Sequence, residues 1–270
     1  MRDKSHTLKQ ELVNSVIALA EDRIAKDKQA EVKSFIRRFY ENVAPQDILS
    51  EKVEDLFGSA ESIWSFGTVR NSGSAKIRAY NPRFDAEGWQ SPHTIIEIIN
   101  DDMPFLVDSV STVLTTMGLT IHLVIHPIID LRRSISGEVE ALLNSEEHGD
   151  GISRESFMQL RISGQGSKEV LSSITAELHS VLDDVRASVE DWRTMRKTVL
   201  DVVTGLGVSE TLDNREEASE IIDFLRWIED KHFIFLGYRE LEYVGSDKST
   251  HMEVVDGSGL GILRKPETSV

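Results

Sequence analysis

A change of periodicity near residue 100 constrains the fold more than any other feature of the sequence. Residues 93–100 (HTIIEIIN) are rich in β-branched side chains and predict a strand. Three polar residues at 100–102 end this run, and Pro104 follows closely. From Pro104 to residue 117 the apolar residues recur at helical spacing. The chain therefore predicts a strand that turns directly into a helix.

The segments around this turn extend the pattern. Residues 119–133 predict a long strand with a hairpin partner, and 157–163 predict another strand. A helix follows from residue 170 and ends near Trp192 or a little beyond. The middle of the chain is therefore β-α-β-β-(β)-α, in elements too short for a doubly wound nucleotide-binding sheet. This order predicts an α+β fold, with helices on one face of a mostly antiparallel sheet.

Three regions follow from the same patterns. Residues 1–70 show helical periodicity and predict a helical lead-in. Residues 71–204 hold the α/β domain. Residues 205–270 predict a second α+β subdomain, whose strands run to the last residues without a closing helix. We therefore expect this subdomain to be truncated at its C-terminal end.

The composition of the chain disfavours some classes of binding partner and predicts its cellular location. The 270 residues carry a formal net charge of −16, which disfavours nucleic acid and anionic membranes as partners. The chain has no cysteine, so disulfides and thiolate chemistry are excluded. The first thirty residues hold no signal-peptide core, and no stretch reaches the length of a membrane span. We expect a cytoplasmic protein.

The adjacent aspartates at the turn have three possible roles. A general acid/base pair needs two carboxylates in different environments, whereas Asp101 and Asp102 would share one wet environment. Asp102 can instead cap the helix that Pro104 opens, while Asp101 adds negative charge at the positive end of the helix dipole. A role in binding a ligand is the alternative, and catalysis ranks below both.

Other candidate sites are weaker. His122 and His126 have the i, i+4 spacing of a zinc pair on a helix, but their apolar neighbours predict a strand, where they would stand ~13 Å apart. Residues 163–169 lack the glycine spacing of a phosphate loop, and the glycines of 257–261 precede a strand-like segment. We therefore expect no catalytic, cofactor-binding or metal-binding residue in this chain.

The residues around the turn resemble a known family. The segments that carry the resemblance are GWQSPHTIIEIINDDMPFLVDSV (88–110), GLTIHLVIHPII (118–129), VRASVEDWRTMR (185–196), FLRWIEDKHFIFLGYRE (224–240) and GLGILR (259–264). They are similar to the amino-terminal region of the very large bacterial NAD-specific glutamate dehydrogenases. The resemblance implies a longer polypeptide, in which ACT-like domains precede a core that oxidises L-glutamate to 2-oxoglutarate and ammonia with NAD. It places the catalytic lysine and the NAD-binding glycines of that core outside this chain.

The resemblance also implies a place for a ligand. ACT domains bind effectors, often amino acids, where the first strand turns into the first helix. The residues there are Asn100, Asp101, Asp102, Met103 and Phe105. The usual ACT pattern is an acid, a variable residue and Pro-Gly, and Phe105 stands where the glycine would be. Glycine would let a ligand approach closely, whereas a phenylalanine would fill that space.

These observations predict a non-catalytic regulatory and oligomerisation segment, with the ACT-like domain at 71–204. Its expected partners are the remainder of the same polypeptide, further copies in a homo-oligomer and an amino-acid effector. The alternatives are a pure assembly scaffold, or a stand-alone ACT-like module that binds an amino acid. An independent acid/base enzyme that uses Asp101, Asp102 and His93 is a third hypothesis, and it lacks an orienting partner.

Overall fold

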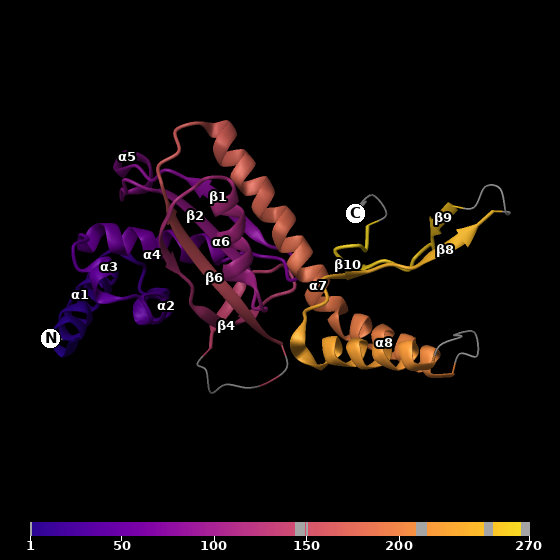
Figure 1. Cartoon of the computed structure of the whole chain (residues 1–270). Coiled ribbons are helices and arrows are strands. Elements are labelled where there is room, and N and C mark those ends of the chain that lie inside the picture. The colour runs from indigo at the N-terminus through magenta and orange to yellow at the C-terminus, as the bar shows by residue number, and fades with distance from the viewer. Residues whose placement is uncertain (1, 144–148, 150, 209–214, 246–250, 266–270) are drawn as a thin grey trace. The chain divides into compact units, whose positions relative to one another are not determined.

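The computed structural model describes residues 2–143, 149, 151–208, 215–245 and 251–265 (Figure 1). They form two compact units, Met1–Leu182 and Asp183–Val270. Each unit is described by itself.

The first unit begins with four helices, α1 (Arg2–Arg23), α2 (Gln29–Glu41), α3 (Pro45–Ile48) and α4 (Val53–Gly67). The predicted helical lead-in is thus present, although the boundary at residue 70 stays a prediction. Phe35 on α2 joins it to the sheet, because its ring lies 4.9 Å from Trp64 on α4 and 5.4 Å from Phe157 in the sheet. Contacts between aromatic rings at these distances add to the area that they bury.

Six antiparallel strands form the sheet: β1 (Lys76–Tyr80), β2 (Thr94–Asp101), β3 (Ile121–Ile125), β4 (Ile128–Arg133), β5 (Val139–Leu142) and β6 (Ile152–Ile162). Their order is β1-β2-β6-β4-β5, and β3 also pairs with β6. The short helix α5 (Phe84–Glu87) precedes β2. Two further helices, α6 (Leu106–Thr116) and α7 (Lys168–Val208), follow β2 and β6.

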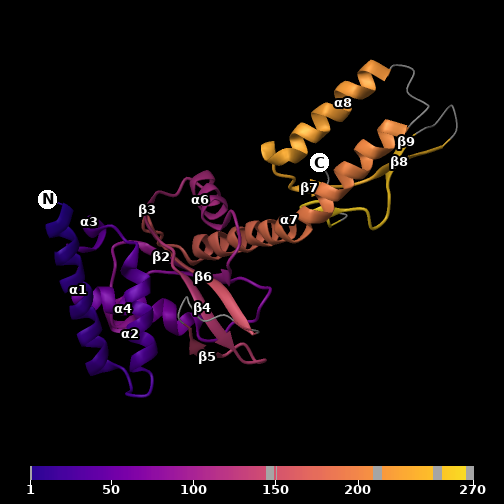
Figure 2. The same cartoon turned by 90° about the horizontal axis from the view of Figure 1, so that it is seen from below.

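Both faces of the central strands are buried. Ile99 pairs with Phe157, and both belong to the core that α1, α2 and α4 share. The next pair, Ile98 and Met158, is also buried and points to the opposite face, because side chains alternate along a strand. Figure 2 shows α6 and the first part of α7 on the side of the sheet away from α1–α4. The lead-in helices therefore cover the face that the ACT-like helices leave open.

The order of elements confirms an α+β, ACT-like fold with one variation. β2, α6, the strands β3 to β6 and α7 give the expected β-α-β-β-α succession. In a complete β-α-β-β-α-β unit, the strand after the second helix would pair beside the first strand. Here β1, which precedes β2 in the chain, takes that place.

The helix α7 is longer than predicted. It does not end near Trp192 but continues to Val208, and its first part up to Leu182 belongs to the first unit. Beyond Trp192 its apolar stripe continues, since Met195 and Val203 are buried. No proline interrupts the segment, and its first glycine is Gly205. The helix therefore has no reason to stop at residue 192.

The second unit contains the rest of α7, α8 (Arg215–Trp227), a π-helical turn (Ile228–His232), β7 (Gly237–Tyr238), β8 (Leu241–Val244), β9 (His251–Val254) and β10 (Leu260–Gly261). The strands form two separate two-stranded sheets, β7 with β10 and β8 with β9. Asp191 on α7 holds the first of these sheets, because its carboxylate accepts a hydrogen bond of 2.8 Å from the backbone N–H of Gly261. A set of large apolar side chains stays exposed here, including Phe224, Trp227, Phe233, Ile234, Tyr243 and Met252.

Candidate functional site

The turn after β2 brings the five predicted ligand residues together, but its first aspartate already has partners. Asp101 is the last residue of β2. One carboxylate oxygen lies 2.6 Å from Nη2 of Arg70, and the other accepts a 3.0 Å hydrogen bond from the N–H of Gly73. Asp101 thus fastens the loop after α4 to the end of the sheet.

Arg70 is the centre of a buried charge network. It is 3% exposed and donates from Nε to Glu155, a fully buried residue opposite Asp101 in the sheet. Glu155 also accepts from Nε of Arg133 at 2.6 Å. Burial would raise the pKa of Glu155, but hydrogen bonds from Arg133 and Arg70 hold that pKa below its ordinary value. The network is therefore ionised at neutral pH and serves to hold the structure.

Asp102 does not cap a helix, so that prediction is wrong. Its N–H donates to the carbonyl of Arg154 at 2.9 Å, and its carboxylate lies 3.3 Å from the guanidinium of the same residue. The first helical residue is Leu106, and the N-cap position belongs to Phe105, which makes no side-chain capping bond. Both the backbone and the carboxylate of Asp102 therefore contact Arg154 of β6, and the carboxylate does not reach the start of α6.

Phe105 has a left-handed backbone with φ of 71°. Among the described residues no other residue except glycine has a positive φ. An L-residue pays roughly 1–2 kcal/mol for this conformation, whereas glycine does not. The residue is 42% exposed, so part of its surface stays open to solvent. The backbone thus keeps the shape that the glycine of the ACT pattern would adopt.

Asn100 and Met103 complete the turn. Asn100 is 1% exposed and lies opposite Ser156 in the sheet, while Met103 is half-buried. The ligand role of the five residues stays a prediction. The geometry shows that both carboxylates are engaged by arginines of the same chain.

His93 lies at the other end of β2 and cannot join these aspartates. Eight residues of extended chain separate it from Asp101, which is roughly 26 Å at 3.3 Å per residue. One acid/base site that contains all three residues is therefore excluded by geometry.

The partner of His126 could not be predicted from the sequence. Its Nε2 lies 2.6 Å from Oγ of Ser156, which is fully buried. Burial lowers the pKa of His126, and the nearby Asp102 opposes this shift. A serine, a histidine and an aspartate thus lie near the turn, but the hydroxyl is closed to solvent and has no route to a substrate. Nucleophilic chemistry does not follow from this arrangement.

A second polar cluster, also unpredicted, lies between α4 and the sheet. Glu97 is fully buried and accepts from Nε of Arg78 at 2.6 Å and from Nε2 of Gln159 at 3.1 Å. Gln159 in turn accepts from Ser59 on α4 at 2.7 Å. Burial raises the pKa of Glu97, although Arg78 opposes the shift. The cluster joins the helix to the sheet by hydrogen bonds where a purely apolar contact would be expected.

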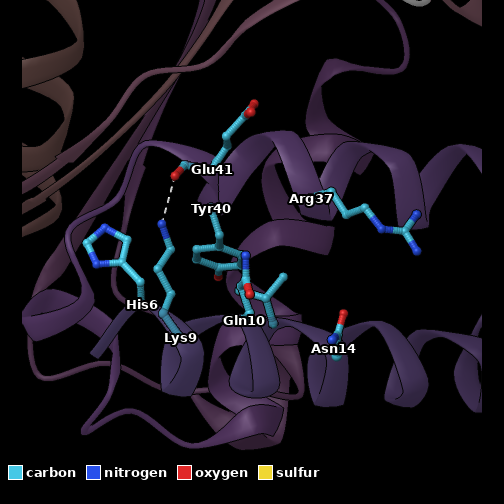
Figure 3. A pocket seen from close by; sticks show the side chains of 8 residues that line it. His6, Lys9, Gln10, Asn14, Arg37, Tyr40 and Glu41 are labelled. Carbon is cyan, nitrogen blue, oxygen red and sulfur yellow. Dashed lines mark hydrogen bonds between the residues drawn. The ribbon is translucent and has the colours of Figure 1, made fainter. Parts of the chain in front are cut away.

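Two adjoining cavities, of about 350 and 630 Å³, lie between α1 and the chain around the end of α2. Figure 3 shows the smaller one. Lys9 lies on the wall of both, is 9% exposed and donates to the carbonyls of Glu41 at 2.7 Å and Val43 at 2.6 Å. Burial lowers its pKa, and Glu41 opposes that shift. The ammonium therefore caps the negative end of α2 and ties α1 to it.

The described residues hold no group of three or more histidine, cysteine or acidic side chains that could bind a metal ion. Within the same residues, no helix is long and apolar enough to cross a membrane.

An antiparallel sheet with this order of helices defines an ACT-like α+β domain. The chain belongs to the family described as glutamate dehydrogenase, ACT1 domain, whose model matches residues 35–178.

Three relatives extend the comparison. The chain is similar to the NAD-specific glutamate dehydrogenase of Halomonas elongata, with 32% identity over 245 residues, which are 90% of this chain and 15% of that protein. The enzyme of the same name from Pseudomonas aeruginosa is 31% identical over 234 residues, 87% of this chain and 14% of that protein. The Mycobacterium tuberculosis enzyme is 26% identical over 208 residues, 74% of this chain and 12% of that protein. The chain thus spans only about a seventh of the first two relatives.

Proposed function

We propose that this chain is the amino-terminal assembly and regulatory segment of a NAD-dependent glutamate dehydrogenase, and that it carries out no chemistry itself. The names of the relatives support the parent activity, the oxidation of L-glutamate to 2-oxoglutarate and ammonia with NAD. The family match supports the ACT-like nature of the segment. Its partners are then the remainder of the same polypeptide and further copies in a homo-oligomer.

The ion pairs at the turn favour a role in subunit assembly over the binding of an amino-acid effector. A free carboxylate would be the strongest partner for the α-amino group of an amino-acid effector. Asp101 is held by Arg70 and Gly73, and Asp102 is paired with Arg154. This engagement of both acids is the observation that carries the proposal.

The backbone of Phe105 favours the second candidate, an amino-acid sensor. Its left-handed conformation keeps the glycine-like shape of an ACT turn, and the ring is partly exposed beside the start of α6. A strained, exposed residue at a turn is a common feature of binding sites.

A melting experiment separates the two candidates. A ligand that binds only the folded state raises its stability by RT ln(1 + [L]/Kd), about 2.7 kcal/mol at a hundredfold excess over Kd. For a sensor, at least one of the twenty amino acids raises Tm, and Phe105→Gly strengthens the effect by opening the site. For an assembly segment, no amino acid moves Tm, while dilution lowers both Tm and the sedimentation coefficient. If neither amino acids nor dilution change Tm, the assembly proposal is wrong.

A further inference from the structure

A β-bulge in β3 changes the direction of one histidine. In the pairing with β6, Ile121 lies opposite Ile162, and Leu123 lies opposite Arg161, the next residue of β6. Two steps along β3 therefore match one step along β6, and His122 is the extra residue. Bulges re-aim side chains and are frequent next to binding sites.

The re-aimed ring meets a second histidine. The rings of His122 and His93 are stacked, with centroids 4.4 Å apart and an angle of 30° between their planes. His93 comes from the loop before β2, and β2 and β3 lie on opposite sides of β6. The two imidazoles thus meet across the end of β6. His122 is exposed and His93 half-buried, so solvent reaches the pair.

A buried arginine lies beside this pair. Arg161 is opposite Ile95 on one side and Leu123 on the other, residues that lie close in sequence to His93 and His122. It is 5% exposed, and its Nη1 donates to Glu51 at 3.0 Å. Its Nε is buried and has no acceptor among the described residues. One hydrogen-bond donor of a buried cation is therefore left over.

The cluster of His93, His122 and Arg161 has an unusual composition for such an acidic chain. The chain carries a net charge of −16, yet two histidines and an arginine gather here against one acid, Glu51. Burial lowers the pKa of His93, as do His122 and Arg161, while Glu51 opposes the shift. These are the charged groups that act on His93, and the single acid is already paired with Arg161. The unsatisfied group is thus the Nε of Arg161, which has no acceptor among the described residues.

We propose that His93, His122 and Arg161 form a binding site for a small oxyanion, the phosphate or carboxylate group of a ligand. Imidazolium and guanidinium groups are strong donors to such oxygens. A metal ion fits less well, because stacked rings hold their nitrogens side by side rather than around one centre. Binding of an anion and protonation of the histidines must reinforce each other, so the affinity rises as the pH falls. This site is independent of the turn at residues 100–105.

A histidine titration by NMR tests the site in the whole 270-residue chain. The ring signals would be followed in chloride, in sulfate as a surrogate for phosphate, and in acetate, at constant ionic strength. We expect the pKa of His93 to rise by roughly one pH unit, with saturation, in at least one of the two oxyanions, and the ring signals of His122 to respond at the same concentrations. A response to sulfate alone indicates a phosphate-type ligand, and a response to acetate alone indicates a carboxylate.

His251 provides the control histidine, because it belongs to the other unit and lies 2.7 Å from Glu253. Its ring signals should not respond to the anions. An equal shift at all three histidines, or a shift that grows linearly without saturation, would mean an adventitious ion only and would overturn the proposal.

Two variants test the roles of the residues. His122→Gln changes an exposed ring and should weaken the saturable binding at least fivefold. Glu51→Gln removes the one acid and should tighten binding several-fold, which a purely structural role of the cluster would not produce. Circular dichroism confirms that each variant is folded. Unchanged affinity in both variants contradicts the site.

Discussion

Nη2 of Arg70 and Oδ1 of Asp101 lie 2.6 Å apart, and this contact joins the loop after α4 to the end of β2. The pair explains why the two neighbouring aspartates of the turn differ. Asp101 neutralises an arginine that is 3% exposed, whereas Asp102 pairs with an arginine whose side chain is 66% exposed. Their contributions to stability should differ accordingly.

We therefore expect Asp101→Ala to lower the free energy of unfolding by about 2 kcal/mol, since it leaves a buried cation short of a partner. Asp102→Ala should cost at most about 1 kcal/mol, because exposed ion pairs contribute little. Urea unfolding of both variants measures the difference. Equal losses in the two variants would show that the network around Arg70 does not depend on Asp101.

Phe105→Gly should be more stable than Phe105→Ala by about 1 kcal/mol, because glycine adopts a positive φ without the cost that an L-residue pays. Both variants lose the ring, more than half of whose area is buried, so the difference between them reports the backbone alone. Ser109→Gly, within α6, is the matched control and should destabilise by about 0.5 kcal/mol. Thermal unfolding of these variants tests this. Equal stability of Phe105→Gly and Phe105→Ala would contradict the strain at this position.

Lys9→Met should lower the free energy of unfolding by about 2 kcal/mol, since the carbonyls of Glu41 and Val43 would lose their donor. Lys4→Met removes an exposed charge from the same helix and should change stability by less than about 0.5 kcal/mol. Urea unfolding compares the two. If Lys9→Met changed stability as little as Lys4→Met, the hydrogen bonds of the Lys9 ammonium would not stabilise the fold.

Glu97 should make stability depend on pH. Its pKa in the folded chain lies above the ordinary value of 4.5, because burial disfavours its charged form. Its contribution to stability is thus fully present below pH 4.5 and is lost as the pH rises through the folded pKa. Glu97→Gln should not show this loss. We expect the stability of the variant relative to the original chain to increase as the pH rises above 4.5, as measured by urea unfolding in a series of buffers. A difference that stays constant with pH would contradict the raised pKa.

The purified chain should not reduce NAD in the presence of L-glutamate, because we found no candidate catalytic residue or nucleotide loop in its sequence. The absorbance of the reduced nucleotide measures this, with a full-length glutamate dehydrogenase as the positive control. Activity that survives repurification and is lost on changing a residue of this chain would refute the proposal.

The sequence was sufficient where the signal is local. The β-branched run at 93–100 and the periodic residues at 104–117 correspond closely to β2 (Thr94–Asp101) and α6 (Leu106–Thr116). The role of Asp101 was not predictable, because its partner Arg70 is 31 residues away in the chain. Nor could one strand reveal the bulge at His122, which exists only relative to β6.

The place of β1 in the sheet has a consequence for synthesis on the ribosome. Every strand of the six-stranded sheet lies between residues 76 and 162, because β1 fills the edge that a strand after α7 would otherwise fill. The nascent chain therefore holds all hydrogen-bonding partners of the sheet before α7 has emerged. Domains generally fold as units in the order of their synthesis. The first unit can thus complete its sheet early, with its β2 edge already covered when the second unit is still being made.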